Sequence, residues 1–158
     1  MGEVGFGLSR DLSCPVGWAL VGSKGLVEEA KRRRKMVGGG MRQAGGLAAA
    51  GLVALDSMVD RLAEDHQNAR RLASGLANID GLTIDCDNIQ TNIVIFDVDA
   101  TVGSATAFIK AMAEANVLVS YPGETSVRMV THRHISGEDI EEALSRTSKV
   151  VRALEGQI

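Results

Sequence analysis

The sequence is poor in several residue types, and each shortage excludes a class of protein. Its 158 residues include two prolines, two cysteines, one Trp, one Tyr and three Phe. No apolar run approaches the roughly 20 residues of a membrane-spanning helix, and residues 1–20 lack the basic start and apolar stretch of a signal peptide. A formal net charge of -3 gives no overall signature of nucleic-acid binding. We therefore expect a globular protein with one domain or two small ones, with no nucleic-acid or membrane partner.

The two cysteines, Cys14 and Cys86, lie far apart in the sequence. They form neither a CxxC pair nor a disulfide framework. Two reduced thiols are typical of a cytoplasmic protein, and we predict that location. A catalytic role for Cys14 is the alternative, although no base lies near it in the sequence.

The first part of the chain predicts two strands and a helix. Residues 4–8 and 16–22 have the composition of short strands, separated by a break at Pro15. Ser23 can cap a helix over 24–37, which the glycines of 38–40 end.

Residues 41–55 are apolar nearly all round, which is typical of a helix buried between domains or subunits. Ser57 and Asp60 then resemble a capping box for a helix that reaches about Ala77. Residues spaced by three and four positions predict its buried stripe: Val59, Leu62, His66, Ala69, Ala73 and Leu76.

The last part of the chain predicts a compact α+β unit. Strands are expected at 82–85, 91–98, 117–120 and 126–132, and a helix at 101–115. A final helix begins at a cap formed by Ser136 and Asp139.

Several motifs of the chain occur together in one known family. GLSRDLSCPVG, RRRKM and GGGMRQAG lie within residues 7–45, and TNIVIFDV and SVRMVTH follow at 91–98 and 126–132. In this order they resemble the C-terminal part of threonine aldolases, which depend on pyridoxal 5'-phosphate (PLP) and have the aspartate-aminotransferase fold. The motifs within residues 7–45 are specific, and the later ones are weak one by one.

The resemblance implies a fold and a domain organisation. It implies an α/β chain, the C-terminal segment of a PLP-dependent transferase of fold type I, with a partial large-domain hairpin, long helices and a small α+β domain. Residues 1–56 would be a remnant of the PLP-binding large domain, 57–78 a connecting helix, and 79–158 the small C-terminal domain. The family's phosphate loop, ring-stacking histidine and aspartate partner of the ring nitrogen belong to a preceding part of the chain.

The resemblance also assigns site residues. Arg10 stands where the family has the lysine that holds PLP covalently, and a guanidinium is too basic and too poor a nucleophile to replace it. Lys35 corresponds to a lysine that reaches toward the active site, Arg42 to an arginine that binds PLP phosphate in the neighbouring subunit's site, and Arg128 to the arginine that grips the substrate carboxylate. The alternative for Lys35 is a solvated helix face, and for Arg42 and Arg128 a surface or strand-edge position.

The activity that the resemblance implies is the cleavage of threonine to glycine and acetaldehyde. PLP would be the cofactor, a small amino acid the substrate, and a second copy or a related full-length subunit the partner. With Arg10 and without the preceding half of the fold, the chain alone is expected to be inactive. The alternatives are a noncatalytic oligomerisation or interaction module derived from such an enzyme, and an anion-binding regulatory domain.

Four other features have weaker functional interpretations. KRRRK at 31–35 could bind anions but is better explained as a solvated helix face, and Gly38–Gly40 could hold a phosphate but favours a tight turn. His132 and His134, or Asp97 and Asp99, could ligate a metal. We expect the ordinary ends of strands at both pairs, and no metal.

Overall fold

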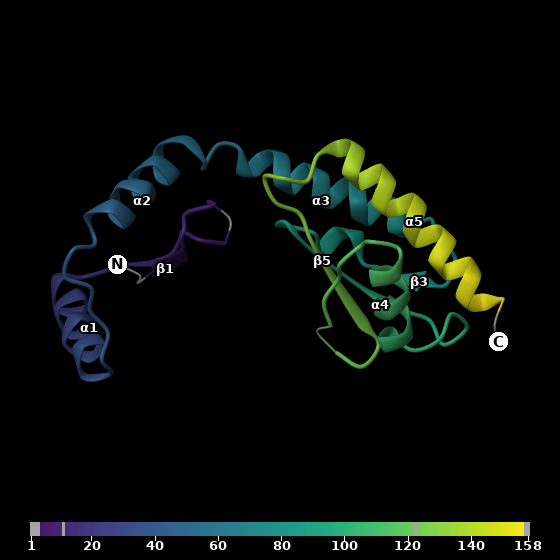
Figure 1. Ribbon diagram of the computed structural model, residues 1–158, viewed down its shortest axis with the longest axis horizontal. Coiled ribbons are helices and arrows are strands. Elements are labelled where there is room, and N and C mark those ends of the chain that lie inside the picture. The colour runs from purple at the N-terminus through teal and green to yellow at the C-terminus, as the bar shows by residue number, and fades with distance from the viewer. Residues whose placement is uncertain (1–3, 11, 122, 157–158) are drawn as a thin grey trace. The chain divides into compact units, whose positions relative to one another are not determined.

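The computed structural model describes residues 4–10, 12–121 and 123–156 (Figure 1). The chain divides into two compact units: an N-terminal unit that ends at Leu62 and a C-terminal unit that begins at Ala63. Most of residues 57–78, which the sequence predicts as a connecting helix, lie in the C-terminal unit, where their apolar face is part of that unit's core.

The N-terminal unit begins with an antiparallel hairpin of β1 (Val4–Gly7) and β2 (Trp18–Val21). Gly7 pairs with Trp18, and a Cβ at Gly7 would lie 3.5 Å from the indole. The glycines of β1 therefore allow the Trp18 ring to lie close over the strand. The opposite side of the ring is open, since Trp18 is 69% exposed.

Helix α1 (Lys24–Met36) begins at the Ser23 cap, whose hydroxyl accepts from the Leu26 N–H at 3.3 Å. It ends in a Schellman motif. The Gly39 N–H donates to the Arg34 carbonyl at 2.8 Å, and the Gly38 N–H donates to the Lys35 carbonyl at 3.1 Å. Gly38 has φ +80°, a conformation that favours glycine.

Helix α2 (Gly45–Ser57) is apolar all round, but only Gly51 and Ala54 are buried. The core of the N-terminal unit contains three buried apolar residues among those described: Leu12, Cys14 and Ala54. Because a hydrophobic core of this size contributes little free energy, most of the unit's stability must come from other contacts.

The predicted capping box at Ser57 and Asp60 is wrong. Helix α2 continues through Ser57, and α3 (Leu62–Leu76) begins five residues later. The apolar run before Ser57 extends the first helix past the expected cap. The break between the helices therefore lies at 58–61.

The C-terminal unit is an antiparallel sheet covered on one face by helices. Its elements after α3 are β3 (Leu82–Thr83), the 3-10 helix η1 (Cys86–Asn88), β4 (Ile93–Val98), α4 (Ala105–Glu114), β5 (Ser126–Val130) and α5 (Gly137–Glu155). The strand order is β3-β4-β5. Leu72 of α3, Phe108 of α4 and Ile140 of α5 belong to the same core as Phe96 and Val127 of the strands.

The other face of this sheet is open. Along β4 and β5 the side chains alternate, so that Phe96 and Val127 point into the core while the neighbouring pair Ile95 and Arg128 lies on the open face. Ile95 is exposed and Arg128 is half-buried. The open face therefore carries the candidate carboxylate-binding arginine.

Several details of the expected pattern differ, and Val59 of the predicted buried stripe is exposed. Residues 117–120 contribute only an isolated bridge between Ser120 and Arg128, not a strand. His66 is half-buried, and Asp65 and Asn68 are buried instead. The Asn68 side chain is satisfied because it donates to the Ile135 carbonyl. The backbone carbonyl of Asp65 accepts from the Thr131 hydroxyl.

Candidate active site

Arg10 lies on an exposed loop between the two hairpin strands. The loop is fixed at its base, where the Leu8 N–H donates to the Gly17 carbonyl at 3.0 Å and the Leu8 carbonyl accepts from Cys14 at 3.1 Å. Leu12 and Cys14 anchor the loop against Ala54 of α2. The fold thus places residue 10 in a defined loop but presents a guanidinium there.

Cys14 is buried and is part of this small core. This position indicates that Cys14 serves in packing. Cys86 is exposed, and both thiols are free.

Lys35 lies in the last turn of α1, where its ammonium folds over the glycine turn. A Cβ at Gly40 would lie 3.2 Å from the Lys35 Nζ. Lys35 makes no ion pair among the described residues, whereas Lys31, Arg32 and Arg33 of the same basic run pair with Glu28 and Glu29. The KRRRK run is therefore largely an exposed helix face with internal ion pairs.

Arg42 is exposed in the segment between α1 and α2. No described hydrogen bond or ion pair joins it to Arg10 or Lys35. Three of the four predicted site residues thus belong to the N-terminal unit, and Arg128 belongs to the C-terminal unit.

Arg128 has a more constrained environment. It pairs with Ile95 of β4 on one side and with Ser120 on the other. Its Nε is buried and has no hydrogen-bond partner. In the part of the chain that the structure describes, its guanidinium forms no ion pair.

Asp97 lies on the same open face but is engaged elsewhere. Its Oδ1 accepts from the Ser126 hydroxyl at 2.7 Å and from the Thr125 hydroxyl at 3.1 Å. Asp99 accepts from the Thr83 hydroxyl at 3.1 Å. The carboxylate nearest in register to Arg128 is thus satisfied by hydroxyls, which leaves the guanidinium available to an external anion.

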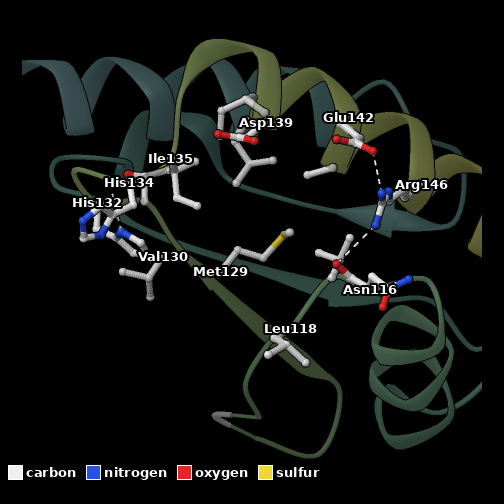
Figure 2. Close-up of a pocket in the computed structure, with 15 residues that line it drawn as sticks. Asn116, Leu118, Met129, Val130, His132, His134, Ile135, Asp139, Glu142 and Arg146 are labelled. Carbon is white, nitrogen blue, oxygen red and sulfur yellow. Dashed lines mark hydrogen bonds and ion pairs between the residues drawn. The ribbon is translucent and has the colours of Figure 1, made fainter.

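The C-terminal unit contains a cavity of about 470 Å³ on its helical side. Figure 2 shows His132 and His134 at one end, Glu142 and Arg146 at the other, and Met129 between them. Several of its polar groups have partners: His132 Nδ1 accepts from the His134 N–H at 3.3 Å, and Arg146 donates to Glu142 and to the Ala115 carbonyl. None of the predicted site residues lines this cavity.

Asp139, also at the cavity, is held by the cap of α5. Hydrogen bonds from the Ser136 N–H and hydroxyl lower the pKa of Asp139 below its ordinary value. The capping box predicted at Ser136 is therefore present.

A metal centre is absent from the described residues, where no group of three or more His, Cys, Asp and Glu side chains could hold an ion. His132 and His134 instead pack with their rings edge to face, 5.7 Å apart. Across residues 4–10, 12–121 and 123–156, no helix is long and apolar enough to cross a membrane.

The described residues do not fit PLP as a complete site. The position at which the resemblance expects an amine carries Arg10, and a guanidinium cannot replace an amine there. Arg42 and Arg128 have side chains suited to anions. We therefore assign no reaction step to the cofactor in this chain.

Sequence reasoning missed Ser120. It gave the residue no role beyond a place in an expected strand, because a lone serine at the end of that strand carries no signal of its own. Only the bridge to Arg128 reveals that the two residues are neighbours.

A model of the beta-eliminating lyases matches residues 3–101. The chain belongs to the beta-eliminating lyase family. Among its curated relatives, the low specificity L-threonine aldolase of Escherichia coli (strain K12) is 42% identical over 135 residues, which are 85% of this chain and 38% of the relative. Low-specificity L-threonine aldolase 1 of Arabidopsis thaliana is 37% identical over 139 residues, 87% of this chain and 39% of the relative.

Solved structures show the same fold for this family member. The serine palmitoyltransferase of Sphingomonas wittichii superposes with a TM-score of 0.76 at 23% identity, over 99% of this chain and 41% of that one. The fold is thus α/β, that of PLP-dependent fold type I enzymes matched over part of their length. The chain spans about two fifths of the length of these curated relatives.

Proposed function

We propose that these residues are the C-terminal part of a threonine-aldolase-like, PLP-dependent carbon–carbon lyase. The whole enzyme would cleave threonine to glycine and acetaldehyde. The observation that carries this proposal is 37% and 42% identity to two threonine aldolases over 87% and 85% of the chain. The alternative of a noncatalytic interaction module has no observation in its favour over this one.

The proposal assigns roles to residues of this chain. Arg128 would bind the substrate carboxylate, since it is unpaired on an open sheet face. Arg42, which is exposed, would bind the phosphate of PLP in a neighbouring site, and Lys35 would supply positive charge near it. Arg10 cannot hold the cofactor covalently, so these residues alone would not turn over threonine.

The surface of the N-terminal unit supports the proposal that the chain works in an assembly. Trp18 and Leu52 are 69% and 64% exposed, and the unit buries only a small core. Exposed apolar patches of this kind mark interfaces. We propose that residues 1–56 belong to the large domain, 57–78 connect, and 79–158 form the small domain. The remaining part of the fold, or a further copy, would cover the apolar surface in a cytoplasmic oligomer.

A complementation experiment tests the proposal. The Arg10→Lys chain is assayed for PLP-dependent glycine release from threonine, alone and after co-expression with the N-terminal three fifths of the Escherichia coli relative. We expect no activity from the Arg10→Lys chain alone. Catalytic groups that act together give little activity when only one of them is restored. Activity is expected only in the co-expressed pair.

The matched control is Arg10→Gln in the same pair, which removes the guanidinium without adding an amine. Activity in that control, or family-like rates from the Arg10→Lys chain alone, would contradict the proposal. A stable but inactive Arg10→Lys pair would instead favour the interaction module.

A further inference from the structure

Ser120 holds the backbone of Arg128 at both of its polar groups. The Ser120 N–H donates to the Arg128 carbonyl at 3.0 Å, and the Arg128 N–H donates to the Ser120 carbonyl at 2.9 Å. In an antiparallel pair of this kind the two side chains lie on the same face of the sheet. Since Ile95 pairs with Arg128 from the other side, the arginine is fixed between two neighbours.

The Ser120 side chain adds a third contact. Its hydroxyl donates to the Arg128 carbonyl at 3.3 Å. A hydroxyl that donates one hydrogen bond still has two lone pairs that can accept. The Arg128 side chain extends from the same face of the sheet, and its Nε–H is buried without a partner, which is costly for a group of a charged side chain.

We propose that Ser120 is a positioning residue for Arg128, and that its hydroxyl accepts the Nε–H when the guanidinium binds a carboxylate. The two terminal nitrogens then face outward as a fork and meet the carboxylate of an amino acid end-on. Ile95, an apolar neighbour, offers no competing acceptor. This inference rests on the proposed function, because it takes Arg128 as the carboxylate-binding residue.

The test uses the full chain labelled with ¹⁵N and follows the Nε–H signal of Arg128 by NMR. The signal is assigned by its loss in Arg128→Lys. Two quantities are measured: the exchange rate of Nε–H with water, and the shift of the signal on titration with glycine. The variants are Ser120→Ala, which removes the hydroxyl, and Ser120→Thr, which keeps it.

We expect Ser120→Ala to speed Nε–H exchange and to weaken the glycine response by roughly 3- to 10-fold, the value of one hydrogen bond. Ser120→Thr should remain close to the original chain in both measurements. A merely structural role would not separate these two variants.

Unchanged exchange and titration in Ser120→Ala would overturn the proposal, and so would equal losses in Ser120→Ala and Ser120→Thr. If the original chain shows no glycine response, the role of Arg128 in the proposed function fails. In that case the exchange rates alone decide whether Ser120 positions the guanidinium.

Discussion

The hydroxyl of Thr131 donates a hydrogen bond of 2.7 Å to the backbone carbonyl of Asp65, with both residues 1% exposed. It joins α3 to the end of β5 across 66 positions of sequence. Asn68 makes a parallel link to the Ile135 carbonyl at 3.0 Å. These two polar contacts fix the position of α3 relative to residues 131–135, in addition to its apolar packing.

Replacing Thr131 with Val should therefore lower the free energy of unfolding of the C-terminal unit by about 1–3 kcal/mol, because a buried acceptor loses its donor at constant volume. Chemical denaturation followed by circular dichroism measures the change. Thr147→Val is the matched control, since Thr147 is equally buried but donates only to the Ala143 carbonyl within its own helix. If both variants lose the same free energy of unfolding, the hydrogen bond to Asp65 contributes no more than a bond within one helix.

The glycine turn after α1 gives a second prediction. Gly38→Ala should destabilise the end of α1 by about 1–2 kcal/mol, because an alanine is strained at φ +80°. Amide hydrogen exchange at Arg33–Val37 measures the opening of this turn. Gly25→Ala, in the first turn of α1 with open space around it, should slow exchange at the start of the helix instead.

Covalent attachment of PLP gives a third prediction. After incubation with PLP and reduction with borohydride, peptide mapping should find no stoichiometric label, because position 10 carries a guanidinium. Scattered labelling of exposed lysines is expected at low yield. Full labelling of one site, such as Lys35, would refute this account, and Arg10→Lys serves as the comparison.

The apolar surface of α2 gives a fourth prediction. The purified chain should associate at micromolar concentrations, and Leu52→Asp should weaken that association several-fold, since it places a charge on an exposed apolar helix. Sedimentation velocity measures the effect. Leu118→Asp is the control, because Leu118 is 89% exposed in the C-terminal unit. A clean monomer without substitution would contradict the prediction.

Local patterns predicted most elements, because caps and alternation act over a few residues. Ser23 and Ser136 cap helices as predicted, and the alternation of 93–98 matches β4. The helix expected over 101–115 begins later, at Ala105 after the Ser104 cap. The cap predicted at Ser57 is wrong, because the apolar helix before it continues through that residue.

Long-range pairs could not be predicted from the sequence. Asp65 and Thr131, 66 positions apart, are brought together by the packing of α3. Ser120 and Arg128 are only eight positions apart on two segments expected as strands, but the sequence does not fix which residues pair. The motifs of the sequence were enough to name the candidate site residues. The geometry of the site depended on these contacts, for which one sequence contains no signal.

The unequal cores have a consequence for the order of synthesis. Three apolar residues form the core of the N-terminal unit and 18 that of the C-terminal unit, among the described residues. A ribosome releases the N-terminal unit first, so its apolar helix and hairpin emerge before the better-packed unit exists. During that interval the nascent chain exposes apolar surface, which favours aggregation until another surface covers it.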